Sequence, residues 1–467
     1  MEFEKVLVEN FASFCDCSSV LIKCRFALAL GYYADNLFQQ HHDLFIKTIE
    51  FLIKNLALES TERVLALQSA DTLKSIISDQ DMVNRLELFI NKVLPHLSTM
   101  VGTMSLPAFF DILSSIITSY STAIDQNLIP LLDALVARIE KEFRELRAKG
   151  EKYDLEISKC CNIIRAICDE SSFYPEYLDK IENSLLPLFN YLVDPKNVEF
   201  DEDLIQYIAI LIRRRESISE NMAKLFPFMK QYYDKHGGCF GSLMKTVNYY
   251  LYYGKEQFMA NKVWLEQIMH LAHSSLYSTE SPIELNNTNG AVLCQMILQI
   301  PTNPILDSYI PLLLAEMLKR LEAAQTLDLL TKQLYNAFLC AICNNAHVTL
   351  TYLETQGKLA PLLDAIAKDV KKYRGNYDKK VLVIGLSNVI AQENLPASIS
   401  KASSKILDII VTVLQEQTAE ETKKLLKSDK KAISVDASSS EDDSSDSGEE
   451  DEMMDSGNKI KGEEKYL

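Results

Sequence analysis

The stretch YIPLLL at residues 309–314 decides the fold, because its pattern of apolar residues around a central proline recurs along the chain. LIPLL at 128–132 and LLPLF at 185–189 repeat the pattern closely, and VLPHL at 93–97, LFPFM at 225–229 and LAPLL at 359–363 repeat it more loosely. Successive central prolines are 35, 57, 40, 84 and 50 residues apart. Most of these spacings fit one period of about 40 to 47 residues, with 84 counted as two periods.

Proline suits the first turn of a helix, where its missing N–H would have no partner in any case. We therefore interpret each copy as a helix start, and each helix start as one unit of a helical repeat. A period of this length belongs to the HEAT and armadillo class. The sequence thus predicts an all-α fold, a HEAT/armadillo-like α-solenoid built as a right-handed superhelix of antiparallel helix pairs.

Helical apolar spacing continues between these copies and predicts about nine helix pairs over residues 1–418. The clearest helix covers residues 128–147, in which Glu140 and Arg144 lie four apart in the order that stabilises a helix. Its apolar stripe consists of Leu128, Leu131, Leu132, Leu135, Val136, Ile139, Phe143 and Leu146.

The texture of the chain changes at about Ala419, so we predict a second region, residues 419–467, that is disordered and rich in serine and acidic residues. The whole chain carries a net charge of −17, and its last 32 residues hold 12 acidic residues and 3 lysines. An acidic surface attracts basic proteins and repels nucleic acid and anionic lipid. We therefore expect a basic protein partner, no direct nucleic-acid binding and no membrane binding. The candidate acidic residues for such a partner are Asp442, Asp443, Glu449, Glu450, Asp451 and Glu452.

Serines in the same tail have an acidic residue three positions later, which is the spacing that suits an acid-directed kinase. The candidate phosphorylation sites are Ser438, Ser439, Ser440 and Ser447. A plain solvating tail is the competing interpretation, because serine and acidic tracts are common in disordered ends.

No catalytic or cofactor-binding motif was found: neither a GxGxxG nor a GxxxxGK[ST] loop occurs. Cys340 and Cys343 have the spacing of metal ligands but lack a second pair, so core thiols are the preferred reading. His270 and His273 share a helical face without a third ligand nearby, which favours polar surface residues. The sequence therefore predicts no cofactor, no metal site and no enzyme activity. Ten cysteines without a secretory signal indicate reduced thiols in a cytosolic or nuclear protein.

A tyrosine cluster and an arginine run can each be interpreted either as a binding site or as part of the packing and surface of the fold. Four tyrosines within residues 249–253 could form a stacking surface, with some of them exposed, but packing between repeats is preferred. The run Arg213–Arg215 is the strongest basic spot in the body. Acidic residues follow it, so we interpret it as a solvated helix end at the negative end of a helix dipole, not as a nucleic-acid patch.

Several stretches resemble the C-terminal repeats of the importin-β superfamily, in particular the branch of importin seven and importin eight. They are YIPLLLAEMLKRLE at 309–322, residues 334–354 ending in TLTYLE, DKKVLVIGLSNVI at 378–390 and, upstream, ERVLALQSADTLKSII at 62–77. The resemblance covers most of residues 20–395 and rests on the order of the units, since HEAT units share apolar spacing and no single motif is diagnostic.

This resemblance implies a nuclear transport receptor that wraps basic cargo and releases it to Ran bound to GTP. The chain would then be the cargo-binding portion, with ribosomal proteins or histones as the type of cargo and nucleoporins as further candidate partners. It would be found in cytoplasm and nucleus and at the nuclear envelope. Family members are much longer and carry their main Ran-binding repeats in an N-terminal part that has no counterpart here, so Ran-GTP binding is expected only if those repeats are supplied. The alternative is a HEAT-repeat scaffold for a stable assembly without transport activity.

Overall fold

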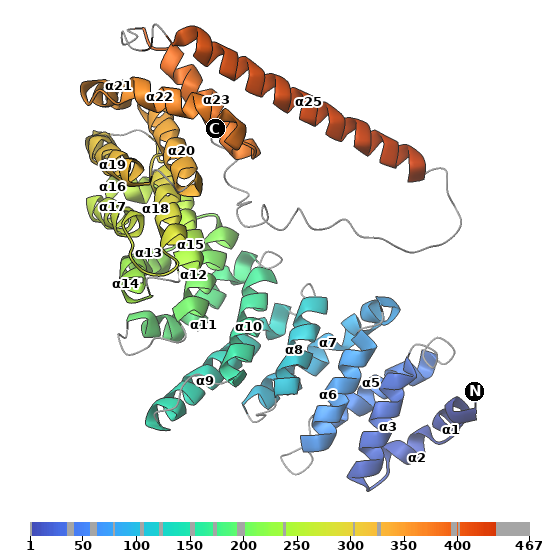
Figure 1. The fold of residues 1–467 in the computed structure, drawn as a ribbon. Helices are drawn as coiled ribbons and strands as arrows, with labels where there is room; N and C mark the ends of the chain where they lie inside the picture. The colour runs from blue at the N-terminus through green and yellow to red at the C-terminus, as the bar shows by residue number, and fades with distance from the viewer. Residues whose placement is uncertain are drawn as a thin grey trace. The chain divides into compact units, whose positions relative to one another are not determined.

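All regular structure in the described residues is helical, as predicted (Figure 1). The computed structural model describes residues 2–34, 42–56, 63–77, 80–102, 107–120, 125–149, 155–170, 175–193, 201–236, 240–301, 304–324, 328–393, 399 and 402–435. Within these ranges, no helix combines the length and the apolar character that crossing a bilayer requires.

The chain forms two compact units, Met1–Met222 and Ala223–Leu467, and α13 (Glu220–Leu225) spans the boundary between them. The other elements of the first unit are α1 (Glu2–Glu9), α2 (Phe11–Cys15), α3 (Val20–Tyr32), α5 (His42–Leu56), α6 (Arg63–Ile77), α7 (Gln80–Val101), α8 (Pro107–Ser119), α9 (Asp125–Lys149), α10 (Leu155–Glu170), η3 (Pro175–Tyr177), α11 (Leu178–Phe189), η4 (Asn190–Val193) and α12 (Asp201–Arg215).

The second unit continues the helical pattern. Its elements are α14 (Pro227–His236), α15 (Phe240–Tyr253), α16 (Lys255–Ala260), α17 (Lys262–Leu276), α18 (Ile283–Ile297), α19 (Pro304–Ala323), α20 (Asp328–Asn344), α21 (Ala346–Thr355), α22 (Leu359–Lys368), η5 (Val370–Lys372), α23 (Asn376–Ile390) and α25 (Ser403–Val435).

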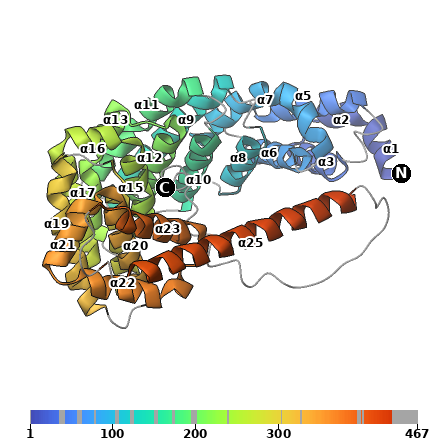
Figure 2. The same cartoon turned by 90° about the horizontal axis from the view of Figure 1, so that it is seen from above.

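Each unit consists of two layers of stacked helices (Figure 1, Figure 2). In the first unit, α3, α6, α8, α10 and α12 pack side by side in one layer, and α5, α7, α9 and α11 form the other. In the second unit, α15, α18, α20, α23 and α25 form the first layer, and α14, α17, α19, α21 and α22 form the second. This arrangement of stacked helix pairs confirms the predicted architecture within each unit. A single continuous array over residues 1–418 stays a prediction.

The apolar stripes face the space between the layers, because an amphipathic helix is stabilised by burying its apolar face. Helix α9 illustrates this: Leu131, Leu132 and Leu135 are fully buried, while Phe143 and Leu146 near the end of the stripe are half-buried. At about 25 cal/mol per Å² of apolar surface, such stripes supply most of the favourable free energy of folding.

The interpretation of the recurring prolines as helix starts is wrong for most copies. Pro95, Pro130, Pro187 and Pro311 lie inside α7, α9, α11 and α19. Each lacks the N–H that would bond the carbonyl four residues earlier, a defect that buried apolar neighbours offset: Ile310, Leu313 and Leu314 around Pro311 are almost completely buried. Five of the six motifs nevertheless lie within second-layer helices, and the motif at 225–229 runs from the end of α13 into the second-layer helix α14, so the pattern does mark a recurring position in the repeat.

The predicted boundary at residue 418 also needs correction, since α25 continues to Val435. Residues 419–427 consist mainly of alanine, glutamate, lysine and leucine, which have little cost in a helix. Disorder from residue 419 is therefore wrong for residues 419–435. The tail residues 436–467, with all candidate acidic and phosphorylation sites, lie outside the described residues.

Candidate interaction surface

Polar contacts between successive first-layer helices connect one repeat with the next in the first unit. Tyr207 of α12 donates its hydroxyl to the carbonyl of Cys161 in α10 at 2.9 Å, and Arg165 of α10 donates to the Gln206 side chain at 2.8 Å. Lys159 of α10 pairs with Asp111 of α8. These contacts hold the neighbouring helices in register, because a hydrogen bond or ion pair forms only when the two groups face each other, whereas apolar contact is not directional.

The end of α12 carries the arginine cluster, which we define as Arg213, Arg214 and Arg215 with their carboxylate partners Asp169, Asp179 and Glu182. Arg213 lies 2.7 Å from the Asp169 carboxylate, and Arg214 donates to the main-chain carbonyl of Asp169. Arg215 lies 2.7 Å from Asp179 and 3.1 Å from the buried Glu182. The cluster therefore joins the ends of α10 and α12 and the start of α11.

The cluster corrects the prediction of a solvated helix end. The run does end a helix, but its arginines are half-buried and paired with the preceding repeat. A sequence signal existed: Asp169 precedes Arg213 by 44 residues, which is one repeat. No local property of the helix distinguishes such a partner from any other acidic residue, so the sequence alone does not identify the pairing.

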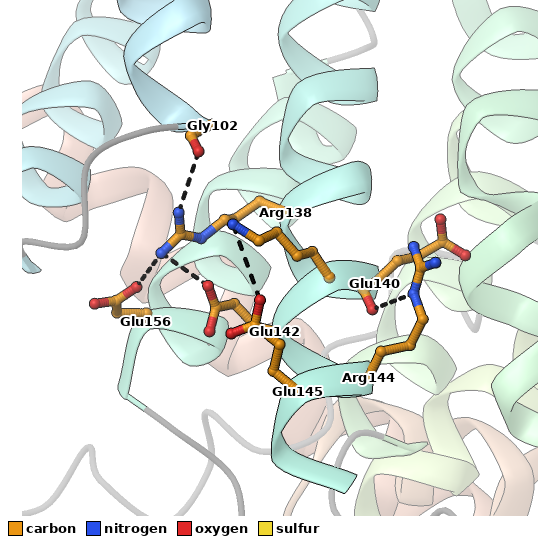
Figure 3. Close-up of polar contacts among 8 residues, drawn as sticks. Gly102, Arg138, Glu140, Glu142, Arg144, Glu145 and Glu156 are labelled. Atoms are coloured by element: carbon orange, nitrogen blue, oxygen red, sulfur yellow. Dashed lines mark hydrogen bonds and ion pairs between the residues drawn. The ribbon is translucent and has the colours of Figure 1, made fainter. Parts of the chain in front are cut away.

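A second charged group lies where α9 approaches α10 (Figure 3). The Arg138 side chain is only 4% exposed and pairs with Glu156 of α10 at 2.6 Å and with Glu142 at 2.9 Å. Its other terminal nitrogen donates to the Gly102 carbonyl, at the end of α7, at 3.5 Å. One guanidinium thus satisfies groups from three elements, as its fork of donors allows.

The predicted pair Glu140 and Arg144 lies on the same helix (Figure 3). There the Arg144 Nε donates to the Glu140 main-chain carbonyl at 3.1 Å.

The second unit carries an amide network across α18, α20 and α23. Gln295 donates to the Gln333 side-chain oxygen at 2.8 Å, and Gln299 donates to the Tyr377 hydroxyl at 2.6 Å. Asn336, which is fully buried, donates to Asp378 at 2.7 Å, and Lys332 pairs with the same carboxylate. The Gln295–Gln333 and Asn336–Asp378 contacts connect residues about one repeat apart, and the Gln299–Tyr377 contact spans about two repeats.

The cysteine and histidine pairs have the structural roles that we preferred. Cys340 is buried and Cys343 half-buried in α20, and burial raises the pKa of the Cys343 thiol to about 11. His270 and His273 are exposed on α17, where His273 lies 3.3 Å from Glu316 of α19. Within the described residues, no group of three or more histidine, cysteine or acidic side chains is placed to hold a metal ion.

The tyrosine cluster of α15 packs between helices, as preferred. Tyr250 is fully buried against Phe226 and Trp264, and Tyr249 is also buried. Tyr252 and Tyr253 are half-buried, so the four tyrosines are not all buried, and these two are partly exposed.

The polar side chains of these groups are thus engaged in holding neighbouring helices together.

A family profile described as the CAS/CSE protein C-terminus matches residues 151–462. The chain is 20% identical over 253 residues to a probable importin-7 homolog of Dictyostelium discoideum, covering 53% of this chain and 23% of that protein. It is 21% identical over 388 residues to mouse importin-8, covering 79% of this chain and 37% of that protein. The chain therefore spans less than two fifths of the length of these relatives.

Two solved structures share the fold. The exportin Cse1 in its cargo-free, cytoplasmic state superposes with a TM-score of 0.62 at 14% identity, over 89% of this chain and 44% of that one. Kap95p, from a study of its binding to RanGDP, gives a TM-score of 0.56 at 11% identity, over 88% of this chain and 53% of that one. These likenesses confirm the HEAT-like solenoid class.

The relatives are named as importins and an exportin, in agreement with the prediction that the chain is not an enzyme. The resemblance inferred from the order of the repeats is confirmed as well. The chain belongs to the CAS/CSE family, whose C-terminal region it matches, and with it to the importin-β superfamily.

Proposed function

We propose that the chain is the cargo-binding portion of a nuclear import receptor that takes basic protein cargo and moves between cytoplasm, nuclear envelope and nucleus. The observation that carries the proposal is the family match over residues 151–462, together with the importin relatives. The stacked layers provide a large surface for a protein partner. The net charge of −17 favours a partner rich in lysine and arginine.

The acidic tail is the proposed contact for that cargo, through Asp442, Asp443, Glu449, Glu450, Asp451 and Glu452. Phosphorylation at Ser438, Ser439, Ser440 or Ser447 would add nearly two negative charges per site and strengthen the attraction. Ran-GTP acts on the cargo complex when N-terminal repeats are supplied. Nucleoporins are further proposed partners.

A pull-down tests the proposal. The full chain is incubated with core histones or basic ribosomal proteins at low and at moderate salt, with an acidic protein of similar size as the control cargo. We expect retention of the basic proteins only, weaker at moderate salt because ions screen exposed charges. A chain ending at Val435 is expected to retain less. Absence of retention at both salt concentrations would contradict the proposal.

Export is a second candidate function, favoured by the CAS/CSE profile and by the fold of the exportin Cse1. The sign of the coupling to Ran-GTP distinguishes the two, because coupling between two ligands is reciprocal. Addition of Ran-GTP together with N-terminal repeats from an importin relative lowers cargo retention for an import receptor and raises it for an export receptor. A scaffold without transport activity predicts no effect of Ran-GTP and a stable partner instead.

A further inference from the structure

The segment from Arg214 to Ile218, at the end of the arginine cluster, has an unusual combination of sequence and exposure. It reads Arg214, Arg215, Glu216, Ser217, Ile218, and α12 ends at Arg215. Glu216 adopts a φ of 53°, in the left-handed region that non-glycine residues rarely enter, so the chain leaves the helix axis at this point. Ser217 follows in an irregular, exposed position before α13 begins.

The two serines of this segment differ in their environment. The half-buried Ser219 donates its hydroxyl to the Glu182 carboxylate at 2.7 Å and accepts the N–H of Met222 at 3.1 Å, so it caps α13. The exposed Ser217 makes one long contact, 3.4 Å, to the carbonyl of Arg215. Ser217 is therefore the hydroxyl that an external enzyme can reach.

We propose that Ser217 is a phosphorylation site for a kinase that selects arginines just before its target serine. Arg214 and Arg215 stand three and two positions before Ser217, and the apolar Ile218 follows it. Kinases discriminate substrates by charge patterns of this kind, since acidic pockets on the kinase pair with the arginines. The Ser217 hydroxyl oxygen attacks the γ-phosphorus of ATP, the hydroxyl proton passes to the catalytic base of the kinase, and ADP leaves.

The arginine cluster controls how readily the site is used. A kinase can engage Arg214 and Arg215 only when the last turn of α12 releases them from Asp169, Asp179 and Glu182. The pairs of Arg213 and Arg214 with Asp169 and of Arg215 with Asp179 are partly exposed, and such pairs each shift an equilibrium by about 5-fold or less. The pair of Arg215 with the buried Glu182 costs more to break, although helix ends open more easily than helix centres. The last turn of α12 is therefore open in only a fraction of the folded molecules. The need to open this turn lowers the rate of phosphorylation relative to that of a free peptide.

The phosphate also changes the cluster after transfer. Its charge of nearly −2 lies two residues from Arg215 and competes with Asp179 and Glu182 for that guanidinium. Phosphorylation thus weakens the contact between the start of α11 and the end of α12. The site is separate from the proposed serines of the tail, which need acidic and not basic neighbours.

The test uses the full chain, ATP and the catalytic subunit of cyclic-AMP-dependent protein kinase, with the peptide of residues 208–222 as reference. Mass spectrometry is expected to map one phosphate to Ser217 in both. Ser217→Ala should lose it, and the matched variant Ser219→Ala should keep it. Absence of phosphate in the full chain, or equal labelling in Ser217→Ala, would overturn the proposal.

Asp169→Asn tests the role of the cluster. Asp169 is absent from the peptide, so the variant affects only the folded chain. The substitution removes the carboxylate charge that lies 2.7 Å from Arg213 and 4.0 Å from Arg214, and it leaves the main-chain carbonyl that accepts from Arg214. Loosening of the last turn of α12 is expected to raise the initial rate of phosphorylation of the full chain by up to about 5-fold, toward the peptide's rate. An unchanged rate would show that the arginine cluster does not limit access to Ser217.

Discussion

Cys294 in α18 shows how the interior of the second unit acts on a single ionisable residue. The side chain is buried, and burial raises the pKa of its thiol to about 12. In an unfolded chain the thiol would have a pKa of about 8.5. Because the folded pKa is the higher one, the thiol ionises first in the unfolded chain. The contribution of the neutral thiol to the stability of the folded state is therefore complete below pH ~8.5. It is lost as the pH rises toward 12.

Cys294→Ala is therefore expected to reduce the dependence of stability on alkaline pH. Urea unfolding with a reducing agent, at about pH 8 and about pH 10, gives the free energy of unfolding for both proteins. The wild type should lose about 2 kcal/mol more than the variant over this interval, since each unit of differential pKa is worth about 1.4 kcal/mol. Other thiols titrate alike in both proteins and cancel. Parallel pH curves would contradict this expectation.

At the scale of the elements, the closest approach between described helices at a glycine is that of α18 to α17. A Cβ added to Gly290 would lie 2.7 Å from the Cα of Leu276 and 2.8 Å from the carbonyl carbon of Ser275. These are main-chain atoms, which cannot rotate away. The absence of a side chain at residue 290 thus sets the distance between the two helices and explains a glycine in a buried helix, where it is otherwise unfavourable.

Gly290→Ala is expected to destabilise the second unit by about 1 to 3 kcal/mol, because the two helices have to separate. Gly241→Ala is the matched control: it is also helical, but its new Cβ meets nothing within 4 Å. There the higher helix propensity of alanine should leave stability unchanged or raise it by up to about 1 kcal/mol. Urea midpoints check both changes, and equal effects at the two sites would refute the explanation.

The prolines inside α7, α9, α11 and α19 are a second lesson at this scale. Sequence rules for proline describe a helix by itself, in which an interior proline costs about 3 kcal/mol. In this fold, packing against neighbouring helices of the same layer and of the other layer outweighs that cost. Pro107, Pro227 and Pro304 do start helices, as the rule expects.

At the scale of the whole molecule, the two compact units are each held together by contacts between neighbouring repeats. Repeat proteins of this kind unfold with limited cooperativity, because each repeat contacts only those next to it. The chain contains a single tryptophan, Trp264, which is buried in the second unit against Phe226 and Phe258. Its fluorescence therefore reports on that unit alone, whereas far-UV circular dichroism reports on all helices.

We expect the fluorescence and circular-dichroism transitions in urea to differ in midpoint. Arg138→Ala removes the partner of Glu142 and Glu156 in the first unit, so it should shift the circular-dichroism transition and leave the Trp264 transition in place. Gly290→Ala, in the second unit, should shift the Trp264 transition. Coincident transitions in the wild type and in both variants would mean that the chain unfolds as one unit.

The sequence by itself determined the helical class, the repeat and the apolar stripe of α9, because apolar periodicity can be read locally along the chain. The resemblance in the order of the units indicated the family. Only the tertiary structure decided which polar groups meet. The pairs Arg213 with Asp169 and Asn336 with Asp378 join residues one repeat apart. Their contact depends on the exact offset between stacked helices. Connecting segments of varied length conceal that offset, and no pattern within a single helix records it.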